Sequence, residues 1–233
     1  MLSLSIVIPA YNECDRLPQT LELFLAYLNA QTYHWQIIVV DDGSTDHTGA
    51  IVASLAEQQP QIQLISLNQN QGKGAAVKCG VLASEGDRIL FSDADGSTPI
   101  TELDKLQTVL DQGIEIAIGN RRNSAIVVRQ PPHRLVIGEV FNWLARVALQ
   151  ADIRDTQCGF KLLQGKIGRQ LFSEMQMTGF SFDVELLYLA IKAGYQIAEV
   201  PVVWVDDKRS KVKVWRDPIL VFIDLIRIRL LHG

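Results

Sequence analysis

The chain has 233 residues, of which 48% are hydrophobic and 21% are charged; this composition is typical of a folded globular protein and excludes a disordered one. The formal net charge of −4 argues against a general nucleic-acid binder, which would usually be basic. Cys14, Cys79 and Cys158 are far apart and form no CxxC pair, which argues against a disulfide framework and a structural zinc site and fits the reducing cytoplasm.

Apolar strand-like runs alternate with helical patterns through the first half of the chain. The predicted strands cover 4–8, 35–40, 63–67, 88–92 and 115–119, and the predicted helices cover 17–28, 48–57, 75–83 and 100–111. This alternation predicts a single α/β domain with a Rossmann-like, mostly parallel sheet flanked by helices.

The second half of the chain is less regular. It predicts helices over 135–149 and 165–174, a loop over 155–161, a helix that opens within 179–185, and a strand over 198–205. The chain shows neither the basic segment and long apolar stretch of a signal peptide nor an apolar run of ~18 residues that would span a membrane.

Polar residues follow each strand of the first half. They read PAYNE at 9–13, DDGS at 41–44, GKG at 72–74, DADG at 93–96 and NRR at 120–122. Because ligands of parallel sheets bind at the carboxyl ends of the strands, this edge of the sheet is the predicted active site.

Asp93 and Asp95 carry the strongest local motif. Two carboxylates on alternate residues at a strand end can both reach one divalent cation, and hard oxygen ligands suit Mg²⁺ or Mn²⁺. Such a cation can bridge the phosphates of a nucleotide diphosphate. The alternative is a pair of solvated aspartates in a turn, and the position after the apolar run 89–91 favours the metal site.

The neighbouring loops suggest how a nucleotide would be held. Asp42 can accept hydrogen bonds from a base or ribose, although this loop also serves to cap the next helix. Lys73 lies between glycines without the spacing of a Walker motif, and before a helix it can bring a cation to a diphosphate. PAYNE stands where a dinucleotide-binding enzyme would carry GxGxxG, and Pro9 and Tyr11 can form a wall for a flat base.

Several basic residues are candidate phosphate ligands because cationic side chains pair with phosphate oxygens. Arg121 and Arg122 are favoured because they follow a strand at the active edge. The complete set is Arg121, Arg122, Arg134, Arg209 and Lys211.

These motifs, with DTQCGFK at 155–161, GFSFDVELL at 179–187, EVPVVW at 199–204 and SKV at 210–212, resemble the family 2 glycosyltransferases along nearly the whole chain. Within that family they are most similar to the dolichyl-phosphate glucosyltransferase and mannosyltransferase branch. The resemblance implies a GT-A fold and an enzyme that moves a hexose from a nucleotide-sugar donor to a polyprenyl phosphate.

The resemblance also implies roles for individual residues. The nucleoside would be held by Pro9, Tyr11, Glu13 and Asp42, and the metal and diphosphate by Asp93 and Asp95. The acceptor phosphate would face Arg121 and Arg134, and the donor would be closed over by Arg209 and Lys211. The tract GSTP at 96–99 favours UDP-glucose over GDP-mannose, which remains the alternative donor.

The acceptor decides the mechanism. An ionised phosphate oxygen can attack the anomeric carbon in line, with inversion and without a general base. A sugar-hydroxyl acceptor would need a catalytic carboxylate, for which Asp155 is the candidate and Asp183 and Glu185 are alternatives. Two other protein classes compete with this interpretation, a sugar nucleotidyltransferase and a non-catalytic nucleotide-binding protein.

The C-terminal segment reads DPILVFIDLIRIRLL at 217–231. Pro218 suits the first turn of a helix. We expect a glycosyltransferase domain over 1–213 and an amphipathic helix over 214–233 that lies in the bilayer interface at the cytoplasmic face. A helix that packs on the core or on another subunit is the alternative.

Overall fold

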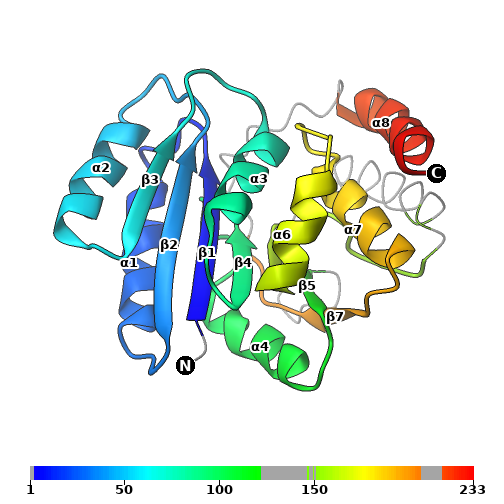
Figure 1. Cartoon of the computed structure of the whole chain (residues 1–233). Coiled ribbons are helices and arrows are strands. Elements are labelled where there is room, and N and C mark those ends of the chain that lie inside the picture. The colour runs from blue at the N-terminus through cyan, green and yellow to red at the C-terminus, as the bar shows by residue number, and fades with distance from the viewer. Residues whose placement is uncertain (1–2, 122–145, 147–148, 150, 206–216) are drawn as a thin grey trace.

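The computed structural model describes residues 3–121, 146, 149, 151–205 and 217–233, the last segment with side chains from 223 onward. Its centre is a seven-stranded sheet with the order β3-β2-β1-β4-β6-β5-β7 (Figure 1). The strands are β1 (Ser3–Ala10), β2 (His34–Asp41), β3 (Ile62–Ser66), β4 (Arg88–Ser92), β5 (Ile116–Asn120), β6 (Phe160–Gln164) and β7 (Ile197–Pro201). All neighbours pair in parallel except β6, which is antiparallel to both β4 and β5. The predicted mostly parallel sheet is confirmed.

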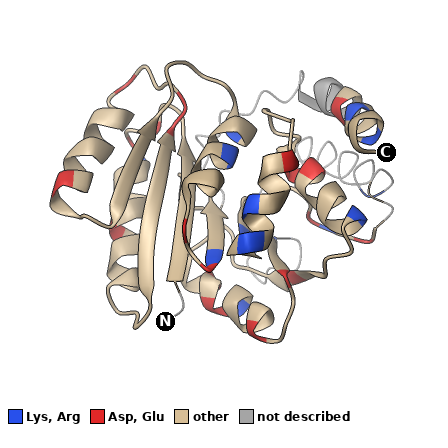
Figure 2. Ribbon diagram, viewed as in Figure 1, with Lys and Arg blue, Asp and Glu red and all other residues tan. Residues whose placement is uncertain are grey.

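Helices cover both faces of this sheet. The helical elements are α1 (Leu17–Leu28), α2 (Thr48–Gln58), η1 (Ile100–Glu102), α4 (Leu103–Asp111), α3 (Lys73–Ala83), α6 (Gly165–Glu174), α7 (Phe182–Lys192) and α8 (Asp217–His232). Alternate residues of a strand point to opposite faces. Ile6 and Ile8 of β1 therefore join the core under α1 and α4, whereas Val7 joins the core under α3, α6 and α7. Among the described helices, α1 and α2 carry only acidic charged positions and α3 carries only basic ones, whereas α6 carries both (Figure 2).

The structure corrects the prediction in the second half of the chain. The segment Phe160–Gln164 is the antiparallel strand β6, whereas the sequence predicts a loop over its first two residues and no strand over the rest. A run of five residues shows too little periodicity to be recognised, and its pairing partners β4 and β5 are distant in sequence. The predicted strand over 198–205 is wrong in its second half, because β7 ends at Pro201.

The N–H of Val202 still donates to Asn120 O of β5 at 3.2 Å, and beyond it the chain leaves the sheet. The N–H of Val203 donates to Glu102 Oε2 at 3.1 Å, and the N–H of Val205 donates to Ser97 O at 2.8 Å. The predicted helix over 135–149 lies outside the described residues, apart from Arg146 and Leu149, which are helical.

The C-terminal helix α8 packs against α7. Leu225 and Ile228 are buried in the same core as α3 and α6, and Ser181 Oγ donates to Asp224 Oδ2 at 2.6 Å. The opposite side of α8 exposes Ile223, Ile226 and Leu230 to solvent. None of the helices in the described segments combines the length and apolar character needed to cross a bilayer.

Helix α3 lies unusually close to the sheet at Gly80. A Cβ atom built on Gly80 would lie 2.4 Å from Cγ1 of Val7 and 3.0 Å from Cγ2 of Val40. Gly168 on α6 also faces the sheet, but its Cβ atom would lie at ordinary contact distance, 3.4 Å from Cδ1 of Ile89. Close packing against the sheet therefore requires glycine at position 80, whereas position 168 has room for a Cβ atom.

We expect Gly80→Ala to lower the free energy of unfolding by about 1–3 kcal/mol, because overpacking outweighs the better helix propensity of alanine. Gly168→Ala should leave it unchanged or raise it by up to ~1 kcal/mol. Urea unfolding of the two variants beside the wild type measures both effects, and equal stabilities for the two would contradict the close packing of α3.

Candidate active site

Asp93 and Asp95 lie in the turn that follows β4, and neighbouring segments fix this turn. The N–H of Asp93 donates to Gly159 O at 3.1 Å, and the hydroxyl of Thr20 donates to Ala94 O at 2.9 Å. A Cβ atom on Gly159 would lie 2.1 Å from Asp93 Oδ2, so only glycine allows this approach. The turn is thus held between α1 and the segment that leads into β6.

Cationic side chains stand beside both aspartates. Lys73 Nζ lies 2.6 Å from Asp93 Oδ1, and Arg16 Nη1 lies 3.6 Å from Asp95 Oδ2. Burial disfavours the charged form of Lys73, but Asp93 and the carboxylates behind it outweigh that effect and raise the pKa of the lysine. Arg16 also donates from Nε to Glu13 Oε2 at 2.6 Å. The edge therefore offers fixed positive charge next to its carboxylates.

Asp93 and Asp95 also fit a divalent cation. Their side chains are 38% and 24% exposed, so both carboxylates are accessible from solvent. Among the described residues no group of three or more His, Cys, Asp or Glu forms a complete metal cage. Mg²⁺ typically takes one or two protein carboxylates and completes its shell with substrate phosphates and water. The donor set therefore suits a metal that arrives with a diphosphate.

The loops after β1 and β2 are joined by side-chain hydrogen bonds. The N–H of Asn12 donates to Ser44 Oγ at 2.8 Å, and the N–H of Glu13 donates to Thr48 Oγ1 at 2.8 Å. Asn12 itself has a φ of 56°, a conformation that asparagine tolerates better than most residues. The ring of Tyr11 in the same loop is 40% exposed at this edge, whereas Pro9 is buried within β1.

Asp42 holds the turn that precedes α3. Its Oδ1 accepts the N–H of Gln71 at 2.7 Å and its Oδ2 accepts the N–H of Gly72 at 2.9 Å. Helix α2 instead receives its capping bond from Asp46, whose Oδ1 accepts the N–H of Thr48 at 2.9 Å. Asp42 is buried, and each of its oxygens already accepts one backbone N–H group. The predicted nucleoside contact of Asp42 remains a prediction.

Lys73 begins α3 two residues earlier than predicted. Gly72 adopts a φ of 101°, which lets the chain turn directly into the helix. Lys73 therefore stands in the first turn of α3, where backbone N–H groups favour anions. The cation of Lys73 therefore reaches the Asp93 turn from the first turn of the helix.

Arg121 and Asp155 form a paired unit. The backbone N–H, Nε and Nη2 of Arg121 donate to the Asp155 carboxylate at 2.9, 2.8 and 2.7 Å. Asp155 is buried, and although burial raises its pKa, the Arg121 guanidinium outweighs that effect and lowers the pKa below its usual range. The Cζ atom of Arg121 lies 5.6 Å from the centroid of the Trp204 ring, within the range of a cation–π interaction.

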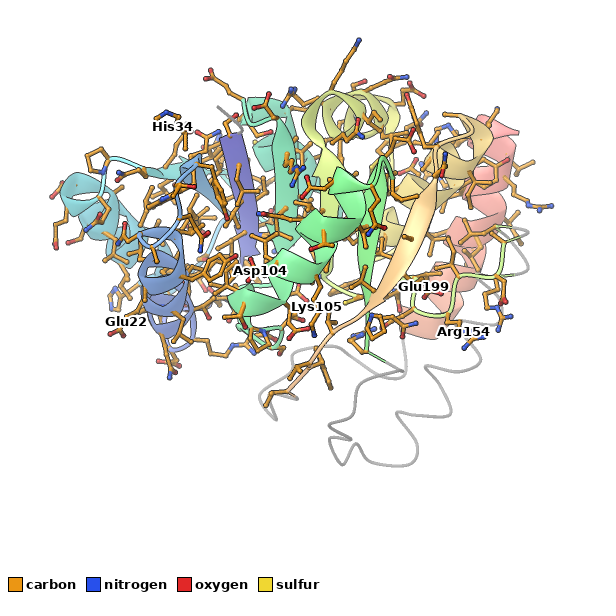
Figure 3. The ribbon with its side chains drawn as sticks, turned by 90° about the horizontal axis from the view of Figure 1, so that it is seen from below. Glu22, His34, Asp104, Lys105, Arg154 and Glu199 are labelled. Atoms are coloured by element: carbon orange, nitrogen blue, oxygen red, sulfur yellow. The ribbon has the colours of Figure 1, made fainter. Side chains whose placement is uncertain are left out.

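Glu199 of β7 holds the backbone that leads into Asp155. Its Oε1 accepts the N–H groups of Arg154 and Asp155 at 2.9 and 3.0 Å (Figure 3). A carboxylate with a lowered pKa is a weak proton acceptor. The geometry of Asp155 consequently favours a role in orienting Arg121 over the general-base role.

A buried ion pair that the sequence did not suggest lies behind Lys73. Lys161 on β6 is completely buried, donates to Cys158 O at 2.6 Å and pairs with Asp183. Burial raises the pKa of Asp183 more than Lys161 and Lys73 lower it. Lys161 was invisible to sequence reasoning because a lone lysine normally indicates the surface, and only its place in the DTQCGFK tract singled it out. Burial also raises the pKa of the Cys158 thiol to about 12, so this thiol is not a nucleophile.

Arg134, Arg209 and Lys211 lie outside the described residues, as does Arg122. The N–H of Val205, the last described residue before 206, donates to the carbonyl of Ser97, which is two positions after Asp95 in the sequence.

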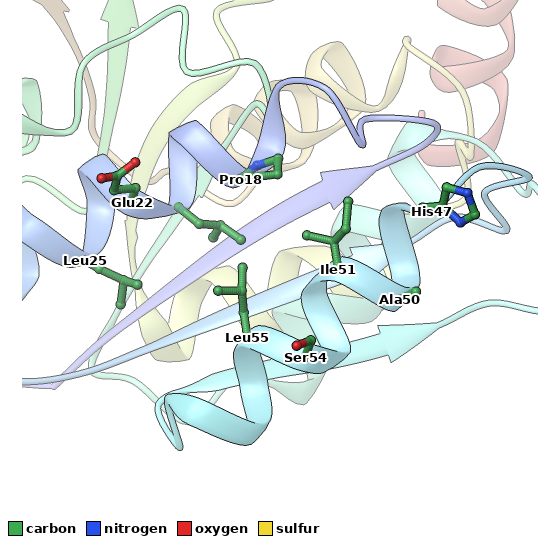
Figure 4. Close-up of a pocket in the computed structure, with 9 residues that line it drawn as sticks. Pro18, Glu22, Leu25, His47, Ala50, Ile51, Ser54 and Leu55 are labelled. Atoms are coloured by element: carbon green, nitrogen blue, oxygen red, sulfur yellow. The ribbon is translucent and has the colours of Figure 1, made fainter.

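An apolar pocket between α1 and α2 is lined by Leu21 and Leu55 among others, and none of the predicted site residues lines it (Figure 4).

Comparison with known proteins identifies relatives of the whole chain. The model of glycosyl transferase family 2 matches residues 5–172. A dolichyl-phosphate beta-glucosyltransferase of Dictyostelium discoideum is 36% identical over 97% of this chain and 73% of the relative, and one of Drosophila melanogaster is 37% identical over 91% and 69%. The crystal structure of glucosyl-3-phosphoglycerate synthase from Mycobacterium tuberculosis with Mn²⁺, UDP and glucosyl-3-phosphoglycerate matches with a TM-score of 0.71 and 22% identity, over 98% of this chain and 79% of that one.

We expect Asp155→Asn to destabilise the protein at neutral pH by about 2–3 kcal/mol, because hydrogen bonds to a charged group are lost around Arg121. The lowered pKa of Asp155 means that its stabilisation is present above the ordinary carboxyl pKa and is lost as the pH falls through the folded value. Urea unfolding at a series of pH values should therefore show the two proteins converging below about pH 4.

Asp152→Asn is the matched control for this experiment. Asp152 pairs with Arg146 on the surface, where its side chain is 68% exposed, and such pairs contribute about 0–1 kcal/mol. A stability difference for Asp155→Asn that stayed constant down to pH 2 would show that the ionised carboxylate is not its source.

Proposed function

The chain belongs to glycosyl transferase family 2, and from this premise we propose that it transfers glucose from UDP-glucose to a polyprenyl phosphate with inversion at the anomeric carbon. One observation carries the proposal: relatives named dolichyl-phosphate beta-glucosyltransferase align with nearly the whole chain at 34–38% identity. These alignments cover 96–97% of this chain and so include the described active edge, and the chain covers about 70–75% of the length of the relatives.

The donor diphosphate would bind between the Asp93 turn and the first turn of α3. Lys73 and the N-terminus of α3 supply positive charge for phosphate oxygens. Asp93 and Asp95 would hold Mg²⁺ or Mn²⁺, which supplies charge stabilisation for the departing nucleoside diphosphate. The crystallised mycobacterial synthase with the same fold contains UDP and Mn²⁺, which supports this assignment.

The nucleoside would lie over the joined loops after β1 and β2. Tyr11 offers an exposed ring for the base, Pro9 shapes the strand end beneath it, and Asp42 offers acceptors for ribose or base donors. Glu13 belongs to the same loop, where Arg16 holds its carboxylate. Arg209 and Lys211 would close over the bound donor, as the family resemblance implies.

The acceptor phosphate would face Arg121, together with Arg134. Asp155 fixes the guanidinium of Arg121 in one plane, so the cation is oriented before the lipid phosphate arrives. A phosphate oxygen is ionised at neutral pH, and it can attack the anomeric carbon without a proton acceptor. The protein contributes position and charge, the two terms that dominate when the nucleophile needs no activation.

A lipid acceptor also requires the enzyme to work at a membrane surface. Ile223, Ile226 and Leu230 lie three and four residues apart on one side of α8 and are 54%, 50% and 81% exposed. Arg227 is exposed beside them and would favour anionic headgroups. We assign this side of α8 to peripheral contact with the cytoplasmic face of the membrane.

The division into a domain over 1–213 and a terminal helix over 214–233 remains a proposal, since Leu225 and Ile228 of α8 are buried in the same core as α3, α6 and α7.

Labelled glucose should pass from UDP-glucose to a short-chain polyprenyl phosphate in the presence of Mn²⁺ or Mg²⁺. We expect Asp95→Ala to reduce this rate by at least about 100-fold, because charge on the leaving diphosphate is no longer stabilised. Asp111→Ala, which removes a carboxylate at the far end of α4, should retain the wild-type rate.

Transfer from GDP-mannose but not from UDP-glucose would overturn the donor assignment and keep the family. Transfer to a sugar hydroxyl instead of the lipid phosphate would overturn the acceptor. A folded protein that neither transfers nor hydrolyses any nucleotide-sugar would overturn the proposed activity as a whole.

Leu230→Asp should weaken binding to vesicles that contain anionic phospholipid by about tenfold or more, because burying one leucine side chain contributes about 1.5–3 kcal/mol. Leu23→Asp is the control, since Leu23 is 58% exposed on α1 at the opposite end of the sheet. Flotation of both variants measures the effect, and equal binding would exclude α8 as the contact surface.

A further inference from the structure

Glu185 is a buried carboxylate that the proposed mechanism does not use. It lies in the first turn of α7 and is completely buried. Its Oε1 accepts the N–H of Gln176 at 2.9 Å, and its Oε2 accepts the N–H of Met177 at 2.8 Å. A buried carboxylate needs such partners to offset its lost hydration. Glu185 therefore fixes the backbone between α6 and α7.

That backbone lies directly against the turn proposed to hold the diphosphate. Thr178 O accepts the N–H of Ala75 at 3.2 Å. A Cβ atom on Gly72 would lie 2.5 Å from Thr178 O, and one on Gly74 would lie 2.6 Å from Met177 O. The glycines around Lys73 are thus in close contact with the two residues that follow Gln176. A shift of this segment must move the turn that carries Lys73.

The same carboxylate contacts the C-terminal helix on its other side. His232 Nε2 lies 2.7 Å from Glu185 Oε1, and the His232 side chain is only 10% exposed. Lys192 of α7 donates to the backbone carbonyl of His232. The last turn of α8 is therefore attached to α7 through Glu185, while Ser181 and Asp224 form a separate attachment.

We infer that Glu185 is a positioning residue for the donor site: it holds residues 176–178 against the Gly72–Gly74 turn, and His232 of α8 holds Glu185. The inference rests on the proposed function in one respect, the assignment of this turn to the donor diphosphate. It assigns no proton transfer to Glu185 and so replaces the general-base alternative for this residue. It also joins the helix proposed to contact the membrane to the turn proposed to bind the donor.

Glu185→Gln tests the hydrogen bonds that Glu185 accepts separately from its packing. Glutamine has nearly the same shape, but an NH2 group, which cannot accept a hydrogen bond, replaces one of the two oxygens. We expect the Kd of UDP in the presence of Mn²⁺, measured by titration calorimetry, to rise about tenfold, in line with the loss of a charge-assisted hydrogen bond. In glucose transfer the KM for UDP-glucose should rise by a similar factor while kcat changes less than about threefold.

His232→Ala tests the second contact without removing the carboxylate, and urea unfolding beside the wild type checks that the variant is folded. The Kd of UDP should rise about two- to fourfold, because Oε1 of Glu185 loses one of its partners. Ser181→Ala is the matched control: it removes the hydrogen bond that Ser181, just before α7, donates to Asp224 of α8, and it should leave the Kd within about twofold.

Hydrogen exchange provides a readout that needs no ligand. In Glu185→Gln and His232→Ala the amides of Gln176 and Met177 should exchange faster than in the wild type, and so should the amide of Ala75. Faster exchange at 176 and 177 with unchanged exchange at 75 and an unchanged Kd would overturn the inference. A wild-type protein that does not bind UDP would instead overturn the proposed donor, while the exchange at Ala75 would still decide whether Glu185 positions the turn.

Discussion

Carboxylates gathered at one edge of a sheet repel each other, and two of them 4 Å apart cost about 4 kcal/mol at the effective dielectric of a protein surface. This constraint governs the carboxyl edge of the sheet, where five acidic side chains have a cationic partner and Asp42 instead accepts two backbone N–H groups. The pairs are Lys73 with Asp93, Arg121 with Asp155, Lys161 with Asp183, and Arg16 with both Glu13 and Asp95. Positive charge for a diphosphate is therefore in place before any ligand binds, which is the condition for electrostatic stabilisation without reorganisation.

Residues 155–161 reach this edge because β6 runs antiparallel to both of its neighbours. An antiparallel strand between β4 and β5 returns the chain to the end of β4, so that Gly159 and Lys161 lie beside and behind the Asp93 turn. Asp155 is brought next to Arg121 at the end of β5 by the same segment. A purely parallel sheet would have placed residues 155–161 at a different edge. The active edge is consequently assembled from both halves of the chain.

The helices of the second half connect this edge to the C-terminus. Residues 176–178 lie against the glycines around Lys73, and Glu185 joins that segment to His232 of α8. Such buried polar contacts have few alternative arrangements, because an unpaired donor or acceptor in the interior costs about 1–3 kcal/mol. The position of α8 and the position of the turn before α3 are therefore linked through hydrogen bonds, not through the apolar core alone.

The sequence by itself determined the elements whose patterns are local: α1 and α6 begin and end where their apolar periodicity indicated, β4 matches its predicted bounds, and Asp93 and Asp95 follow it at the predicted edge. Only the tertiary structure decided which charges are paired. Lys161 is buried although a lone lysine is usually exposed, Asp155 is held by Arg121 although the sequence offers it as the base for a sugar-hydroxyl acceptor, and β6 is too short to recognise without its neighbours. The physical reason is that periodicity reports burial along one element, whereas ion pairing and strand direction depend on residues far apart in the chain that meet only in the folded protein.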